Sequence, residues 1–173
     1  MAHQKTFIER LVEILMSQGV VRSNTGHDLI EQFERSTKEN FEEFLIDELE
    51  LPTEDVLRAL SAYYKVPAFE VRGYFFDHDL LTYFPLDFLL RNAIIPIEVD
   101  EDVMVIAASE PEAPGLRDAI AGYTSDVVEF KVGLRQEIVD AVREFYDYAE
   151  TQVEALDFEK GADEIDENIV DRS

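Results

Sequence analysis

Cysteine is absent from the 173 residues, so disulfides, thiolate metal sites and cysteine nucleophiles are excluded together. Basic side chains are also scarce, because 15 lysines and arginines stand against 39 aspartates and glutamates and give a formal net charge of −24. Such a negative surface repels phosphate backbones and anionic lipid headgroups. We therefore expect no nucleic-acid or membrane-surface binding, and the charge favours basic protein surfaces as partners.

Long apolar runs are missing as well. No uncharged apolar stretch approaches the ~18 residues that a membrane-spanning helix needs. Residues 1–15 lack the uninterrupted apolar segment of a secretory signal peptide. The sequence predicts a soluble, cytoplasmic protein with no direct membrane insertion.

The motifs of common enzymes do not occur. There is no Gly-x-x-x-x-Gly-Lys-Ser/Thr phosphate loop and no nucleophile elbow. His78 lies between Asp77 and Asp79, but no second ligand pair has helix spacing, so a polar turn is favoured over a metal site. The acidic residues 100–102 lack the spacing and the glycine of a calcium loop and are typical of a hairpin tip. We expect no enzymatic activity, no metal and no cofactor.

The sequence does contain the material of a packed core, since 46% of the residues are apolar and 11% are aromatic. In residues 1–66 the apolar side chains recur at helical spacing and predict four helices. Gly19 is predicted to end the first helix, and Thr53 is predicted as the N-cap of the fourth. The predicted apolar faces comprise Phe7, Leu11, Ile14 and Leu15; Leu29, Ile30 and Phe33; Phe41, Phe44, Leu45 and Leu49; and Val56, Leu57, Leu60, Tyr63 and Tyr64.

A weak internal repeat appears when the sequence is shifted by 30 residues. Two stacked helix-turn-helix units would explain it, although any two amphipathic helix pairs can be aligned by their apolar positions. The aligned pairs are Leu11 with Phe41, Ile14 with Phe44, Leu15 with Leu45, Met16 with Ile46, Ile30 with Leu60, and Phe33 with Tyr63.

From residue 67 the pattern changes to short β-rich runs between helices, and the order predicts a β-β-α-β-α unit. Pro96 inside the first run indicates an edge strand. The expected elements are one or two short helices within 80–90 with a start near Pro85, a hairpin of strands 94–99 and 103–108, a helix at 111–122, a strand at 127–132 and a helix at 134–145.

These features predict an α+β fold with three regions. A helical subdomain of two helix-turn-helix units spans 1–66, a small sheet subdomain spans 67–148, and an acidic tail or linker spans 149–173. From Asp147 onward ten acidic residues stand against two basic ones, which is typical of a solvated segment.

Several short segments between Leu45 and Tyr146 occur in an order and spacing that resemble the N-terminal domain of type II secretion and type IV pilus ATPases. The resemblance implies a binding module that docks or regulates the ATPase at the secretion or pilus machinery, without the catalytic domain. The segments are Leu-Ile-Asp-Glu at 45–48, Thr-Glu-Asp-Val-Leu-Arg-Ala-Leu at 53–60, Tyr-Tyr-Lys-Val-Pro at 63–67, Phe-Pro at 84–85, Ile-Pro-Ile at 95–97, Val-Met-Val-Ile-Ala at 103–107, Glu-Pro at 110–111 and Ile-Val-Asp-Ala-Val at 138–142.

Some members of this family bind cyclic di-GMP through two copies of an Arg-Leu-Gly-x-x-Leu-x-x-x-Gly motif. The first copy here keeps its ligand-binding candidates Arg10, Leu11, Leu15 and Gly19, with Val12 in place of the first glycine. The resemblance thus implies cyclic di-GMP, or another nucleotide, as an alternative ligand.

The second copy, residues 40–49, keeps only its central Leu45. Asn40, Phe41 and Glu42 stand where Arg-Leu-Gly is expected, and Leu49 replaces the last glycine. The glutamines that close the two units are replaced by Phe33 and Tyr63. A dinucleotide diphosphate needs arginine forks and close backbone approach, which an acidic or β-branched side chain obstructs. The sequence therefore argues against cyclic di-GMP binding and favours a docking or regulatory role with a protein partner.

Overall fold

The computed structural model describes residues 2–147. The helices of the first part are α1 (Ala2–Ser17), α2 (Gly26–Arg35), α3 (Phe41–Glu43), the π-helical turn η1 (Phe44–Glu48) and α4 (Thr53–Tyr64). The second part contains α5 (His78–Leu81), α6 (Leu86–Asn92), β1 (Ile94–Asp100), β2 (Val103–Ala108), α7 (Leu116–Ala121), β3 (Val127–Val132) and a C-terminal helix whose described residues are 135–147. Helices thus come first and strands later, which confirms the predicted α+β class.

The three strands form one sheet in the order β1-β2-β3. β1 pairs antiparallel with β2, as the hairpin prediction requires, and β2 pairs parallel with β3 after the crossover through α7. β1 is an edge strand, as Pro96 predicted, and the pairing shifts between Pro96 and Glu98 because proline has no N–H for the ladder. Residues 67–69 lie beside the end of β3, where Ala68 forms a parallel bridge with Val132. The N–H of Phe69 donates to the carbonyl of Val132 at 2.8 Å.

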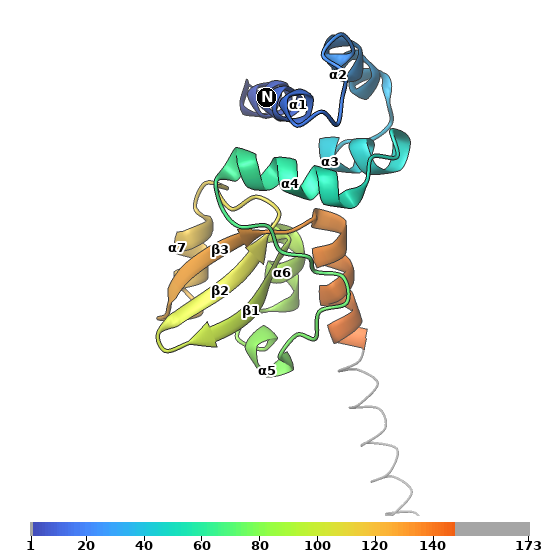
Figure 1. The fold of residues 1–173 in the computed structure, drawn as a ribbon. Coiled ribbons are helices and arrows are strands. Elements are labelled where there is room, and N and C mark those ends of the chain that lie inside the picture. Colours follow the sequence, from blue (N-terminus) through green and yellow to red (C-terminus); the bar gives the residue numbers. More distant parts are fainter. Residues whose placement is uncertain (1, 148–173) are drawn as a thin grey trace, which may run out of the picture.

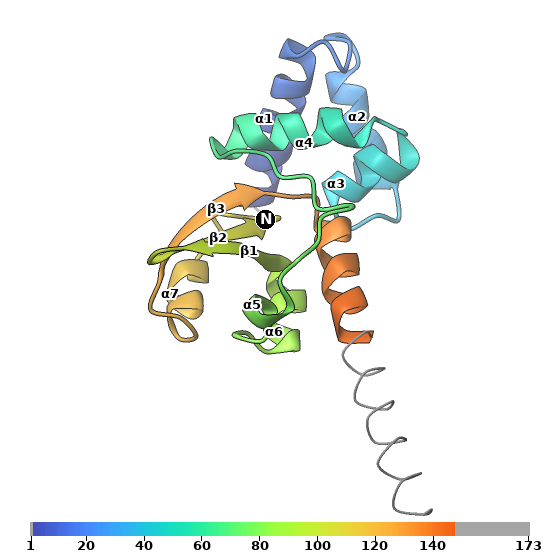
Figure 2. The same ribbon diagram turned by 60° about the horizontal axis from the view of Figure 1, so that its bottom comes forward.

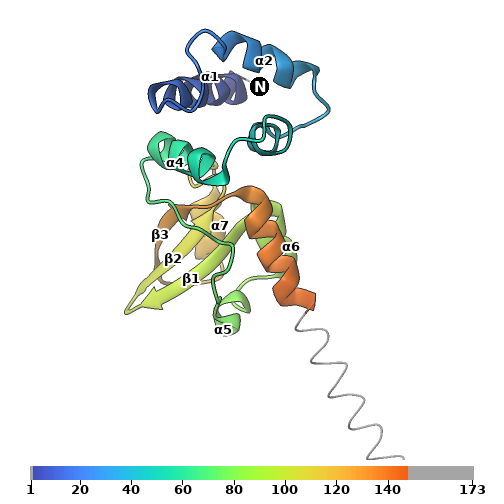
Figure 3. The ribbon, with the colours of Figure 1, turned by 45° about the vertical axis from the view of Figure 1, so that its right-hand side comes forward.

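The helical part lies over one end of this sheet (Figure 1). Figures 2 and 3 show α4 next to the sheet, α1 and α2 on the far side of α4, and the C-terminal helix along one flank. Among residues 2–147 no helix combines the length and apolar character that crossing a membrane requires.

The end of α1 follows the predicted glycine stop. Gly19 has φ +75°, its N–H donates to the carbonyl of Met16 at 3.0 Å, and the N–H of Val20 donates to the carbonyl of Leu15 at 3.0 Å. This pair of bonds is the Schellman motif, which needs a left-handed residue at the position of Gly19. Gly19 therefore terminates the helix and turns the chain towards α2.

Two predicted helix starts are wrong. Thr53 is the first residue of α4 and not its N-cap, because Pro52 takes the cap position and its carbonyl accepts from the N–H groups of Asp55 and Val56. α7 begins at Leu116 and not near Pro111, because Gly115 adopts φ +75°, a left-handed conformation that cannot belong to the helix. Its end at Gly122 agrees with the prediction.

The helices of the first part follow the order that the repeat predicted. Leu11 and Leu15 of the first unit and their counterparts Phe41 and Leu45 of the second are all buried in the same cluster. The second unit differs in its first helix, which is a short α3 followed by the π-helical turn η1.

Two apolar cores meet at the end of β3. One packs α5, α6, α7 and the C-terminal helix on the sheet, and the other lies among α1 to α4. Val132, the last residue of β3, and Leu134, which follows the strand, pack in the helical core. The domain boundary between residues 66 and 67 stays a prediction, and the predicted tail 149–173 lies outside the described residues.

The central strand gives a direct test of this packing. Ile106 is fully buried in β2, so Ile106→Ala should lower the free energy of unfolding by about 2–5 kcal/mol. Val127→Ala, at an exposed position of β3, should change it by less than about 1 kcal/mol. Urea denaturation of both variants measures the difference, and equal losses would contradict the assigned core.

Candidate functional site

A cavity of about 700 Å³ lies where the helical part meets the loop after β2. Its walls come from the start of α1, residues 39–42, the end of α4 and loop 109–114. Three of its lining residues, Asn40, Glu42 and Tyr63, occupy the positions where the second motif copy would have arginine, glycine and the closing glutamine. The fold thus brings the altered positions of the second copy together in one site.

The residues of the first copy are not brought together in this cavity. Leu11 and Leu15 are fully buried in the helical core, and Gly19 forms the turn after α1. Arg10 is exposed on α1 and does not line the cavity. Their predicted role in ligand binding remains a prediction.

Val12, at the first glycine position of the motif, is buried between α1 and α2. A Cβ atom added to Gly26 would lie 3.2 Å from Cγ1 of Val12, so this side chain packs directly on the backbone that begins α2. The side chain of Val12, which a glycine would lack, therefore fills the space between α1 and α2.

Glu42 connects the two parts of the molecule. The backbone N–H of Arg135, at the start of the C-terminal helix, donates to Oε1 of Glu42 at 2.8 Å. Asn40 fixes the approach of α3 to this contact, because its Oδ1 accepts from the N–H groups of Glu42 and Glu43 at 2.9 and 3.3 Å. A carboxylate at a helix N-terminus satisfies a free backbone donor and interacts favourably with the helix dipole.

Burial dominates the ionisation of Glu42, whose residue is only 7% exposed. Desolvation raises its pKa to about 7, against the opposing backbone bond and charge of Arg135, and the charges of Glu43 and Glu137 raise it further. The same site raises the pKa of Tyr64, first through burial and then through the charges of neighbouring groups that include Glu110. Burial is thus the main cause of both shifts, and nearby carboxylates add to it.

A second hollow, of about 360 Å³, lies between residues 71–78 and the C-terminal helix. Phe75 stands at this hollow with 96% of its surface exposed. Tyr74 beside it is held by Phe69 and Phe76, with ring centroids at 5.0 and 4.8 Å. The carboxylates of the hollow come from the C-terminal helix: Glu137, Asp140 and Glu144.

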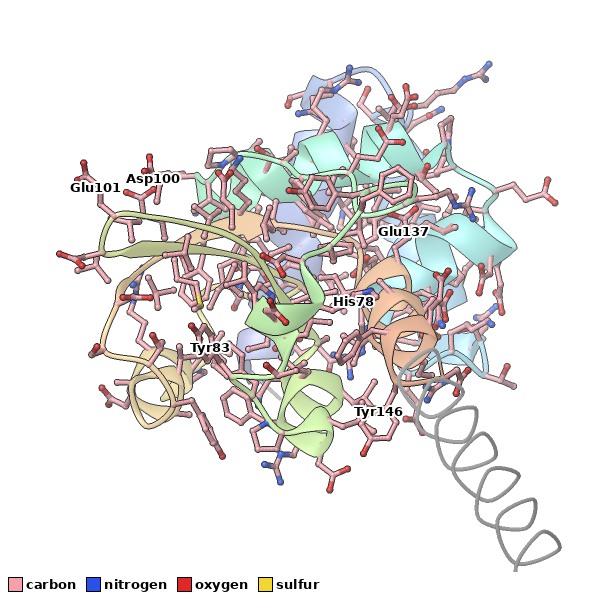
Figure 4. The ribbon with its side chains drawn as sticks, turned by 90° about the horizontal axis from the view of Figure 1, so that it is seen from below. His78, Tyr83, Asp100, Glu101, Glu137 and Tyr146 are labelled. Atoms are coloured by element: carbon pink, nitrogen blue, oxygen red, sulfur yellow. The ribbon has the colours of Figure 1, made fainter. Side chains whose placement is uncertain are left out.

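His78 takes part in the same surface as a packing residue. Its ring lies 4.9 Å from that of Phe145, and Oδ1 of Asp77 accepts from the N–H of Asp79 at 3.0 Å at the start of α5. The predicted polar turn at 77–79 is therefore a helix cap. Figure 4 shows His78 and Glu137 on the side of the C-terminal helix, with Glu101 of the β1–β2 hairpin tip far from them. Within residues 2–147 no group of three or more His, Asp or Glu side chains is arranged to hold a metal ion.

Comparison with known proteins identifies the family to which this fold belongs. The family model described as the MshEN domain matches residues 64–152, which is half of the chain. The chain belongs to the MshEN domain family. The resemblance to N-terminal domains of secretion and pilus ATPases that the sequence predicted is thereby confirmed.

Two solved structures have the same fold as this MshEN chain. A structure of MshE with cdg (cyclic di-GMP) superposes with a TM-score of 0.64 at 20% identity, over 79% of this chain and 99% of that one. The N-terminal domain of XpsE superposes with a TM-score of 0.54 at 21% identity, over 78% of this chain and 92% of that one. No curated protein matches the chain in a sequence search.

Glu42→Gln tests the buried carboxyl group. Because the folded-state pKa of about 7 lies above the ordinary value of 4.5, Glu42 favours the folded state below about pH 4.5, and this contribution is lost as pH rises to about 7. Glutamine keeps the acceptor for Arg135 and removes the titration. The stability of Glu42→Gln relative to the wild type should therefore rise between pH 4.5 and 7, by roughly 3 kcal/mol at most.

Urea denaturation from pH 4.5 to 8 measures this difference. Glu13→Gln, at an exposed position of α1 outside the cavity, is the matched control for the loss of one charge. The difference in unfolding free energy between Glu42→Gln and the wild type could change with pH no more than it does for the control. That result would show that the carboxyl group of Glu42 titrates like an exposed one.

Proposed function

We propose that this MshEN domain is a non-catalytic docking or regulatory module that joins a secretion or pilus ATPase to a protein partner in the cytoplasm. Membership of the MshEN family supports the assignment to the N-terminal domains of secretion and pilus ATPases. The observation that carries the docking role is the side chain of Phe75, which is 96% exposed beside a hollow lined by three carboxylates together with Arg72 and His78. The partner is a component of the secretion or pilus machinery or the cognate ATPase.

The surroundings of Phe75 suit a protein partner. The segment that carries it is held by the packed rings of Tyr74, Phe69 and Phe76, so little conformational entropy is lost when Phe75 inserts into an apolar pocket. Exposed aromatic anchors of this kind carry much of the binding energy in protein interfaces.

The charges around the hollow define the partner's surface. Burial raises the pKa of Glu137, and the neighbouring Arg72 only partly opposes this effect. With Asp140 and Glu144 on the same helix, the hollow offers three carboxylates to basic side chains. We infer a partner with an apolar pocket bordered by lysine or arginine, whose association rate falls as salt is added.

A photocrosslinking phenylalanine analogue at position 75 tests this surface in the cells that produce the chain. It should crosslink to one protein of the secretion or pilus system, and Glu137→Lys with Asp140→Lys should abolish the product by reversing the charge. The matched control is the analogue at Tyr83, which is exposed outside the hollow. Equal products from positions 75 and 83, or none from position 75, would contradict the proposal.

Cyclic di-GMP binding is a second candidate function, and the MshE structure with cdg favours it. That structure conflicts with the expectation from the sequence that cyclic di-GMP does not bind. The residues of this chain support the expectation. Arg10 is the one motif arginine that remains, while Val12 fills the first glycine position and Glu42 the second. An exposed arginine–phosphate pair contributes about 1 kcal/mol, far below the ~8 kcal/mol of micromolar binding.

Calorimetry with cyclic di-GMP, using the MshE domain as positive control, separates the two functions. We expect a dissociation constant weaker than about 100 μM for this chain, since the second copy has Asn40 in place of the arginine and Glu42 in place of the glycine. A low-micromolar constant that Arg10→Ala weakens at least tenfold would establish the sensor function.

A further inference from the structure

The 700 Å³ cavity between the helical part and loop 109–114 contains a set of groups that neither docking at Phe75 nor cyclic di-GMP explains. Its volume is within the range of small-molecule sites, roughly 300–1,000 Å³. We propose that this cavity binds an organic cation through an ammonium or guanidinium group. The inference stands apart from the proposed function, because it concerns other residues and is tested with small cations.

The charged side chains that line the cavity are acidic among the described residues. Four glutamates line the cavity, Glu39, Glu42, Glu110 and Glu112, and no lysine, arginine or histidine whose side chain is described does. Within the described part of the chain the salt bridges join Lys38 to Asp47 and Arg58 to Asp55, so none of the four glutamates forms a salt bridge there, although Glu42 is influenced by the charge of Arg135. A bound cation would supply the missing positive charge.

Ser109 provides an independent indication of a ligand. It is 4% exposed, lines the cavity, and its Oγ has no hydrogen-bond partner. The residue is fixed by its backbone, since its N–H donates to the carbonyl of Ala93 at 3.1 Å. A buried hydroxyl without a partner costs about 1–3 kcal/mol, so a donor from a ligand would satisfy this oxygen. Ammonium and guanidinium groups carry several N–H donors and no acceptor.

Aromatic rings form the third element of the site. The rings of Phe7 and Tyr63 meet edge to face at 4.9 Å, and those of Tyr63 and Tyr64 at 4.8 Å. All three residues line the cavity. Clustered aromatic faces attract alkylammonium and guanidinium ions through their quadrupoles, which adds to the attraction of the carboxylates.

The same groups exclude other ligand classes. A dinucleotide would place its phosphates against four glutamates without an arginine in the walls. A metal ion needs several close carboxylate or imidazole ligands, and no such group is present among residues 2–147. An organic cation uses carboxylates, a hydroxyl and aromatic rings together.

The test uses two probes at constant ionic strength, arginine amide and a blocked Ala-Arg-Ala tripeptide. Calorimetry measures affinity, and amide chemical shifts of Ser109 and Tyr63 report the location. We expect saturable one-to-one binding of at least one probe. Binding of arginine amide alone indicates a free small cation, and equal binding of the tripeptide indicates a basic side chain of a protein.

Variants separate the cavity from the general negative charge. Glu110→Gln with Glu112→Gln removes two exposed carboxylates, so the fold should be retained, and affinity should fall at least tenfold. Ser109→Ala should weaken binding severalfold without loss of stability, because it removes an unsatisfied hydroxyl.

The matched control is Asp100→Asn with Glu101→Gln, which removes two exposed carboxylates at the hairpin tip, and it should change affinity less than twofold. The proposal is overturned if neither probe saturates, or if the control variant loses as much affinity as the cavity variant.

Discussion

The contact between Glu42 and the backbone of Arg135 is the interaction on which the arrangement of the two parts depends. It joins residues 93 positions apart and fixes α3 against the start of the C-terminal helix. Burial of this carboxyl group is unfavourable, as its raised pKa shows, and the helix N-terminus partly offsets that desolvation. Because α3 also forms a wall of the large cavity, the same contact determines the shape of that cavity.

Charge then determines what each surface can bind. The chain carries −24 overall, and acidic side chains line both the large cavity and the hollow beside the C-terminal helix, where Arg72 also lies. The two sites differ in form: Phe75 is an exposed side chain at the hollow of residues 71–78, whereas the larger cavity contains the buried residue Ser109 in its wall. A protruding aromatic residue suits a large partner, and a cavity with a buried unpaired hydroxyl suits a small group.

Much of the fold could be predicted because it is encoded locally. The apolar stripe of α1, the hairpin around residues 100–102 and the alternation in β3 follow from the periods of helices and strands. The start of α7 was missed because the conformation of Gly115 depends on its surroundings, and the π-helical turn η1 has no distinct sequence pattern. Register and strand order beyond the hairpin were likewise set by tertiary packing.

The candidate site was predictable only in part, since its residues come from four separate segments. Asn40, Glu42 and Tyr63 were recognised as departures from a motif, but nothing in the sequence indicated that they share a cavity. Ser109 gave no signal, because an isolated serine acquires meaning only when its hydroxyl is buried without a partner. The Glu42–Arg135 contact was equally hidden, since its donor is a backbone group that every residue except proline possesses.

The residues at the departing positions of the second motif copy each make a defined contact in this structure. Asn40 caps α3, Glu42 bonds the C-terminal helix, and Tyr63 packs on Phe7. Replacing Glu42 by glycine would leave the N–H of Arg135 without its acceptor, and replacing Asn40 by arginine would remove the cap of α3. The motif's arginine and glycine at these two positions would thus oppose the present packing.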